Sequence, residues 1–319
     1  MSMWEPQRKA EVVVSQNPSG LGNRLKSLAS AMRLNSNYRV LWPTNKKCNC
    51  PFGELFENDV EVSQKELKIW KRGNRILCED GKDMEASIYQ AWRIATIKED
   101  NLPEGFNAVG RGYNNWRHAG RLVDMEYNRT PDNITKDVSA CFAKLKPRKE
   151  LLLKIKNFSL ENFKENTVSV QIRSCEKDAS GGAWSKERHK SFSLEPYVSL
   201  MEEHISLGRD TFFVSADKQF VIQELKNIFR NKIIMYPRQT HLNSSRGNIE
   251  GMRETLVELY LLSRNKHFIG TFPSSFSEIA WWLSDPKPSV KIIASKSLYR
   301  GKRDLDADLP NPNSQYIWY

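Results

Sequence analysis

The sequence has 319 residues, of which 39% are hydrophobic, and this composition is typical of folded globular proteins rather than disordered chains. The formal net charge of +11 at pH 7 indicates an anionic ligand, either a phosphorylated compound or a nucleic acid. The basic residues are spread along the chain without a zinc-finger or RNA-binding signature, so nucleic-acid binding is supported by the net charge alone.

The first forty-two residues predict a strand, a glycine-bearing loop, a helix and a second strand. The strands are expected at Glu11–Ser15 and Arg39–Trp42, and apolar residues recur at helical spacing between them. Gly20 and Gly22 in the loop would let the backbone approach a ligand closely. The pattern is not the dinucleotide fingerprint, because Leu25 stands where the third glycine belongs. A plain tight turn explains the two glycines about as well.

The region from 46 to 148 has a weaker pattern, in which short apolar pieces alternate with polar stretches. We assign it to the rest of an N-terminal α/β domain that carries irregular insertions. Residues 110–118 combine aromatic and cationic side chains that could stack on a sugar, although a simple surface loop is the more economical interpretation. Pro147 predicts a boundary between an N-terminal domain, 1–147, and a C-terminal domain, 148–319.

The C-terminal half predicts alternating strands and helices, which is the pattern of a parallel, doubly wound sheet. Together with the N-terminal part, it predicts an α/β protein whose two domains face one another across a cleft. The expected helices are Glu150–Phe163, Leu194–Ser206, Lys218–Phe229, Asn248–Ser263 and Ser274–Leu283. The expected strands are 168–172, Thr211–Ser215, Lys232–Tyr236, His267–Gly270 and Val290–Ala294.

Polar residues follow three of these strands, at the edge where α/β sheets bind ligands. Arg173 follows strand 168–172, and its planar donor fork and permanent charge suit a phosphate group. The alternative is that Arg173 only ends the strand and pairs with a surface carboxylate. Asp217 follows the next strand and could contact a ribose or a base.

The strand from His267 runs through Thr271 to a helix that begins near Ser274. Ser275 and Glu278 match a capping box, which would stabilise the start of this helix. Free amides and hydroxyls at a helix start also bind anions, and both roles are compatible.

The five cysteines indicate neither a disulfide framework nor a zinc site. Their number is odd and their spacing irregular. Cys48 and Cys50 are closer together than the usual zinc pair, and no histidine pair accompanies them. No stretch has the apolar length of a signal peptide or a bilayer span, which predicts a cytoplasmic location.

Three segments together resemble the fucosyltransferase superfamily, which includes the nodulation-factor and core α-1,6-fucosyltransferases and the protein O-fucosyltransferases. Gly20-Leu-Gly-Asn-Arg24 is similar to the superfamily's N-terminal loop, and Gln171–Lys177 resembles its His-x-Arg-Arg-x-Asp-Lys stretch. The most specific similarity is Leu259–Glu278. The chain departs from the superfamily pattern at Gln171, Ser174 and Glu176. It also departs at Lys218, which follows Asp217 where the α-1,6 enzymes have Thr-Asp-Asp.

The resemblance implies a GT-B fold with two Rossmann-like domains and an inverting, metal-independent glycosyltransferase without a cofactor. The donor would be GDP-fucose, and the acceptor a glycan or glycoconjugate hydroxyl. The departures leave open another nucleotide sugar on the same scaffold, or an inactive member. Arg173 would stabilise the leaving diphosphate, with Lys177 and the helix start at Ser274 in place of a metal ion.

Asp178, Glu187 and His189 are candidates for the general base, since they lie in the polar loop 174–191. The predicted catalytic residues are Arg173, Glu187 and Asp178. The residues assigned to donor binding are Gly20, Gly22, Asn23, Arg24, Arg173, Glu176, Lys177, Tyr197, Asp217, Glu258, Thr271, Ser274 and Ser275. A metal-dependent alternative uses Asp304, Asp306 and Asp308, but these lie in a polar tail rather than after a mid-chain strand.

Overall fold

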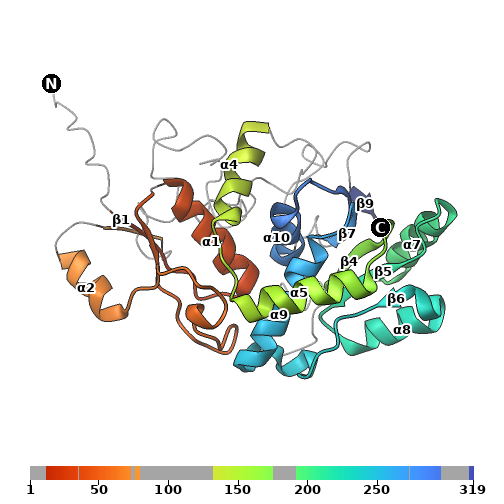
Figure 1. Ribbon diagram of the computed structural model, residues 1–319, viewed down its shortest axis with the longest axis horizontal. Helices are drawn as coiled ribbons and strands as arrows, with labels where there is room; N and C mark the ends of the chain where they lie inside the picture. Colours follow the sequence, from red (N-terminus) through yellow and green to blue (C-terminus); the bar gives the residue numbers. More distant parts are fainter. Residues whose placement is uncertain are drawn as a thin grey trace.

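The computed structural model describes residues 12–34, 36–72, 76–79, 132–174, 192–272, 274–295 and 316–319. These residues form an α/β fold with two parallel sheets (Figure 1). One sheet has the strand order β2-β1-β3, and the other has the order β6-β5-β4-β7-β8-β9. The predicted α/β class with parallel strands is confirmed.

The small sheet contains the predicted strand–loop–helix–strand unit. Strand β1 (Val12–Ser15) pairs with β2 (Tyr38–Val40) and with β3 (Ile76–Glu79). Helix α1 (Leu21–Leu34) connects the first two strands and buries the leucines that predicted it. A short 3-10 turn, η1 (Phe52–Glu54), and helix α2 (Gln64–Arg72) lie between β2 and β3 in the chain.

The large sheet and its helices follow the predicted alternation within one or two residues at most ends. The strands are β4 (Val168–Ile172), β5 (Phe212–Ala216), β6 (Ile233–Ile234), β7 (His267–Thr271), β8 (Ser289–Ala294) and β9 (Tyr316–Trp318). The helices are α5 (Lys149–Asn162), α7 (Glu195–Ser206), α8 (Gln219–Phe229), α9 (Ile249–Leu262) and α10 (Ser275–Leu283), with 3-10 turns η5 (Arg230–Lys232) and η6 (Leu242–Gly247).

The order of the large sheet identifies where a ligand would bind. Numbered along the chain, its strands lie in the order 3-2-1-4-5-6, which is also the strand order of doubly wound dinucleotide-binding sheets. In such a sheet the ligand lies beyond the carboxyl ends of the strands, where the strand order reverses. Here that switch point lies between β4 and β7.

The central strands are buried on both faces, including their polar positions. Every residue of β4 and β5 is buried, since helices cover both faces of a parallel sheet. The buried polar side chains are hydrogen-bonded. Asn265 donates to the Ser169 hydroxyl at 2.9 Å, and the Ser277 hydroxyl donates to Gln171 at 2.5 Å.

A group of helices lies between the two sheets (Figure 1). Helix α10 packs on α1, on α9 and on α4 (Asp132–Ala143), a helix that the sequence analysis did not predict. The largest apolar cluster therefore draws residues from both sides of Pro147. The domain boundary between 1–147 and 148–319 stays a prediction.

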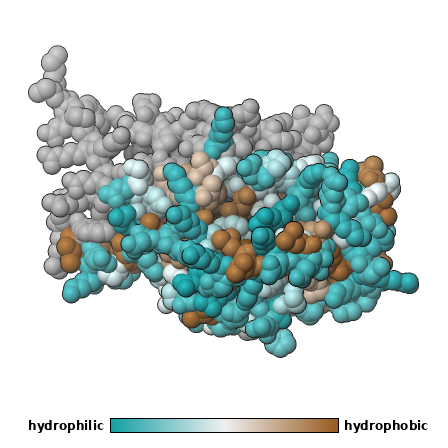
Figure 2. Space-filling view, in the orientation of Figure 1, coloured by the Kyte–Doolittle hydropathy of each residue, from teal (hydrophilic) through white to brown (hydrophobic). Residues whose placement is uncertain are grey.

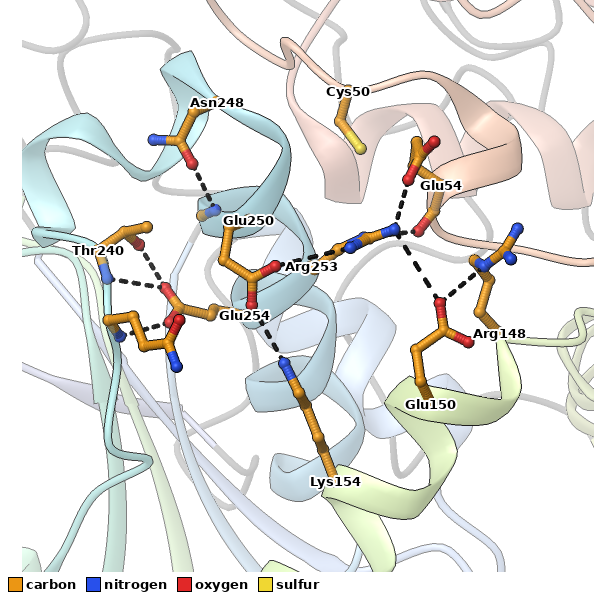
Figure 3. A network of polar contacts seen from close by, with 12 residues as sticks. Cys50, Glu54, Arg148, Glu150, Lys154, Thr240, Asn248, Glu250, Arg253 and Glu254 are labelled. Atoms are coloured by element: carbon orange, nitrogen blue, oxygen red, sulfur yellow. Dashed lines mark hydrogen bonds and ion pairs between the residues drawn. The ribbon is translucent and has the colours of Figure 1, made fainter.

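Ion pairs reinforce the contact between the N-terminal part and α9 (Figure 3). The Arg253 side chain on α9 pairs with Glu54 of η1, and it also donates to the backbone carbonyl of that residue. Lys154 of α5 pairs with Glu250 of α9 at 3.1 Å. Charged side chains thus tie three segments that are distant in the sequence.

Candidate functional site

Three strand ends meet at the switch point of the large sheet. Arg173 follows β4, Asp217 follows β5, and Thr271 ends β7. The Arg173 guanidinium lies 3.1 Å from one carboxylate oxygen of Asp217. The other oxygen accepts hydrogen bonds from the backbone amide and the hydroxyl of Ser174, at 2.8 and 2.9 Å. Asp217 therefore fixes the chain directly after β4.

Arg173 pairs with a carboxylate, as expected if it were only a strand-end residue. The pair nevertheless occupies only part of the hydrogen-bond donors of its guanidinium. A guanidinium has five N–H donors, and Asp217 is its only ion-pair partner in the described residues. The Arg173 side chain is 27% exposed, so an anion in solvent has access to it. The geometry holds a cation at the edge where a doubly wound sheet binds its ligand.

Tyr197 and Thr271 lie behind this edge, and their hydroxyls are bonded within the protein. Their exposed fractions are 1% and 5%. The two hydroxyl oxygens are 2.6 Å apart, and the Thr271 hydroxyl donates to the carbonyl of Gln171 at 2.9 Å. The backbone amide of Arg173 donates to the same Thr271 oxygen at 3.0 Å. Their predicted contact with the donor is untested, and the structure shows them supporting the backbone of Arg173.

Gln171, which replaces a histidine of the superfamily pattern, points toward α10. Its side-chain oxygen accepts a hydrogen bond from Ser277, whose hydroxyl oxygen in turn accepts from the Thr271 amide at 3.1 Å. The side chain is 4% exposed. This departure therefore alters a contact between β4 and α10 within the protein core.

The start of α10 differs from the expected capping box. Ser274 is the N-cap residue, and its hydroxyl accepts from the Ser277 amide at 3.4 Å. Ser275 is the first helical residue. Glu278 does not close a capping box, because its carboxylate forms a buried ion pair with Lys26 of α1. The predicted capping box of Ser275 and Glu278 is wrong. The sequence has two adjacent serines, and either of them could be the N-cap residue; the structure has Ser274 in this position.

Gly22 allows close contact between helices α1 and α10. A Cβ atom built at Gly22 would lie 2.7 Å from the hydroxyl oxygen of Ser275 and 3.0 Å from its carbonyl carbon. At Gly20 the nearest atom to such a Cβ would be 3.9 Å away. The absence of a side chain at Gly22 therefore lets the N-terminal ends of α1 and α10 meet. Helix N-termini carry partial positive charge and free amides, so two of them together favour an anion.

Arg24, which was assigned to donor binding, is buried with an exposed fraction of 1%. Its Nε donates to the carbonyl of Ser19 at 2.6 Å, and its guanidinium lies 4.9 Å from the centre of the Trp42 ring. Among the residues that the structure describes, its terminal nitrogens have no hydrogen-bond partner. Burial lowers the pKa of Arg24 below its ordinary value. The side chain thus holds the loop before α1, while the neighbouring Asn23 is half-buried.

Glu258 also makes its contacts inside the protein. Its two carboxylate oxygens accept from Arg238 at 2.7 and 2.8 Å, and one of them accepts from the Ser215 hydroxyl at 2.8 Å. The residue is 6% exposed. The hydrogen bonds among Glu258, Arg238 and Ser215 tie α9 to β5 beneath the strand end that carries Asp217. No local sequence pattern predicts this pairing.

The remaining predicted residues lie outside the described ranges. They are Glu176, Lys177, Asp178, Glu187, His189, Asp304, Asp306 and Asp308. Within the described ranges, no group of three or more His, Cys, Asp or Glu is arranged to hold a metal ion. None of the helices in those ranges is both long and apolar enough to cross a bilayer.

The doubly wound sheet, with a charged cluster at its switch point, defines the class as an α/β protein with a parallel sheet. No protein-family model and no curated protein matches the sequence. Solved structures do match the fold. NodZ α-1,6-fucosyltransferase soaked with GDP-fucose superposes with a TM-score of 0.53 at 18% identity, covering 86% of this chain and 93% of that one.

Two further NodZ structures give similar values. The selenomethionine form of NodZ from Bradyrhizobium has a TM-score of 0.53 at 18% identity, and the form co-crystallised with GDP has 0.50 at 17%. Both cover 86% of this chain and 93% of the other. The fold of this chain is thus similar to that of the fucosyltransferase NodZ, as the sequence resemblance predicts.

Proposed function

We propose that this protein is a glycosyltransferase that transfers fucose from GDP-fucose to a hydroxyl group of a glycan or glycoconjugate. The observation that supports it most is the position of Arg173. Its guanidinium lies beside Asp217 at the switch point, and its backbone amide is bonded to Thr271, at the end of the strand that precedes α10. The fold is similar to that of NodZ α-1,6-fucosyltransferase, which was crystallised and soaked with GDP-fucose.

The proposed reaction inverts the configuration of the anomeric carbon. The acceptor oxygen forms a bond to this carbon as the bond to the β-phosphate oxygen breaks, and GDP leaves with the bonding electron pair. A general base takes the hydroxyl proton, and Asp178 and Glu187 are the candidates. Arg173 and the helix start at Ser274 would stabilise the charge on the departing diphosphate.

We further propose that the transfer needs no metal ion, because fixed cations and helix amides take its place. Arg173, Lys177 and the amides at the start of α10 would supply the positive charge. Residues 1–147 would then form the acceptor side of the protein, and residues 148–319 the donor side. Transfer in the presence of EDTA tests the metal requirement. Loss of turnover in EDTA, with recovery on adding manganese or magnesium, would contradict it.

The donor is tested by a thermal-shift screen with GDP-, UDP-, dTDP- and CMP-sugars, since a ligand that binds the folded state raises the melting temperature. We expect GDP-fucose to give the largest shift and Arg173→Ala to remove most of it. A larger shift with another sugar nucleotide would favour the same scaffold with a different donor. Salt-sensitive nucleic-acid binding that GDP does not affect would favour the basic nucleic-acid-binding alternative.

A further inference from the structure

The outer side of α5 carries leucines where a surface helix usually carries polar residues. Leu151 and Ile155 are fully buried and define its inner side. At 100° per residue, Leu153 and Leu160 lie nearly opposite to them, and they are 59% and 73% exposed. Both sides of α5 are therefore apolar, although only one of them contacts the core.

Lysines flank these leucines on one side of the helix. Lys149 and Lys156 lie next to Leu153 and Leu160 on the helical wheel, and Leu152, which is 38% exposed, lies just beyond them. We call these five residues the α5 outer face. Figure 2, in the orientation of Figure 1, shows hydrophobic residues among hydrophilic ones over the part of the molecule where α5 lies.

Two of the nearby acidic residues are paired with other cations, whereas Glu161 lies on the opposite flank of the leucines and Glu57 accepts from the backbone amide of Lys149 at 3.1 Å. Glu150 lies 2.7 Å from Arg148, and Glu250 pairs with Lys154 (Figure 3). Neither Lys149 nor Lys156 has an ion-pair partner in the described part of the chain. The α5 outer face therefore combines exposed apolar area with unneutralised positive charge.

A basic hollow lies at the C-terminal end of the same helix. It has a volume of about 260 Å³ and is lined by Ser159, Phe163, Lys164, Glu165, Arg264, Asn265 and Lys266. Lys266 pairs with Glu165 at 2.9 Å, whereas Lys164 and Arg264 make no ion pair within the described ranges. Ser159 is on the lysine side of α5, so the basic hollow continues the α5 outer face.

We propose that the α5 outer face and the basic hollow form a binding surface for membranes that contain anionic phospholipids. The leucines would enter the boundary between headgroups and acyl chains, and the lysines would contact the headgroup phosphates. The basic hollow would hold one phosphate between Lys164 and Arg264. A second copy of this chain is a poorer occupant, because the flanking lysines of both copies would face one another.

The test is flotation of the full chain with vesicles of phosphatidylcholine, with and without phosphatidylglycerol. We expect binding only to the vesicles that contain phosphatidylglycerol, and weaker binding as salt is raised. Leu153→Ser combined with Leu160→Ser should lower vesicle binding by about tenfold or more, because each leucine loses apolar burial. Lys156→Glu combined with Arg264→Glu should lower it and reduce its salt dependence.

The matched control is Leu207→Ser, which removes a leucine of 56% exposure at the end of α7. It should bind vesicles like the unaltered protein. All variants should keep the melting temperature and the GDP-induced shift, since the altered side chains are exposed and, in the part of the chain that the structure describes, none of them forms a hydrogen bond or ion pair with Arg173, Asp217 or Thr271. The proposal is overturned if the protein does not float, if neutral vesicles bind equally well, or if the Leu153/Leu160 variant binds like the control. Self-association that the same variant abolishes would instead assign the surface to a second copy.

Discussion

Arg173 is the single side chain on which the proposed chemistry depends most. Arg173→Ala should lower turnover about a hundredfold or more, the loss typical of a donor that stabilises a transition state. Arg173→Lys should recover only part of it, because the charge remains but the planar fork is lost. Since the side chain is 27% exposed, the melting temperature of the unliganded protein should barely change. Steady-state kinetics with melting curves provide the measurement, and unchanged transfer by the alanine variant would make Arg173 a structural residue.

His204 gives the protein a stability that depends on pH. Burial, together with the positive charges of Arg209, His267 and Lys291, lowers the pKa of His204 to about 4. The unfolded chain, with a histidine pKa near 6.5, therefore binds a proton at a higher pH than the folded protein. The contribution of His204 to stability is complete above about pH 6.5 and is lost as the pH falls toward 4.

Replacing this histidine should flatten the pH dependence. For His204→Gln we expect the free energy of unfolding to fall less between pH 7 and pH 5 than in the unaltered protein, with a difference of about 1–2 kcal/mol. Urea unfolding at the two pH values measures it. His267→Gln is the control, because burial also lowers the pKa of His267 but that residue is more exposed. Parallel pH profiles for His204→Gln and the unaltered protein would show that another group titrates.

At the scale of the elements, the contact between α1 and α10 depends on one glycine. Gly22→Ala places a methyl group against the backbone of Ser275, and such overpacking typically costs about 1–3 kcal/mol. Gly20→Ala is the matched control and should be tolerated, since its Cβ would meet nothing closer than 3.9 Å. Chemical unfolding of the two variants compares them directly. Equal stabilities would mean that the two helix starts can separate at little cost.

The elements themselves were largely predictable, whereas the contacts between them were not. The strands β4, β5 and β7 and their helices were predictable from the spacing of apolar residues. Burial of one side of a strand or helix requires apolar residues to recur with the period of that element. Helix α4 was missed, although Val138 and Phe142 are spaced for a helix, because the surrounding region has a weak pattern. Strand β9 is three residues long, which is too short for any period to be visible.

Within the site, sequence patterns located the strand ends but not the direction of each side chain. Arg173 and Asp217 were found because polar residues follow apolar strands. A buried arginine such as Arg24 could not be foreseen, since arginine is mostly exposed and nothing local reveals the Trp42 ring over which it lies. The pairing of Lys26 with Glu278 joins residues that are 252 positions apart, and no local pattern carries such information.

At the scale of the whole molecule, the two sheets are joined by a shared core, and Lys26 and Glu278 form a buried ion pair between two of its helices. Lys26 of α1 and Glu278 of α10 have side chains that are only 3% and 4% exposed. One Glu278 oxygen has no hydrogen-bond partner within the described ranges, so these residues do not fully compensate the pair. Removing one partner of a buried pair leaves a lone buried charge, which typically costs about 3–5 kcal/mol.

A double-mutant cycle separates this cost from the value of the pair itself. Lys26→Met should destabilise the protein strongly, while Lys26→Met combined with Glu278→Met should regain much of the loss, because apolar side chains of similar size suit a buried site. Lys154→Met is the control, since its ion pair with Glu250 is 42% exposed at the lysine and is expected to contribute at most about 1 kcal/mol. Because the core spans both sheets, each variant should unfold in a single transition whose midpoint shifts as a whole. Two separate unfolding transitions for Lys26→Met would mean that the two sheets belong to independent folding units. A double variant no more stable than Lys26→Met would mean that the ion pair does more than neutralise its own charges.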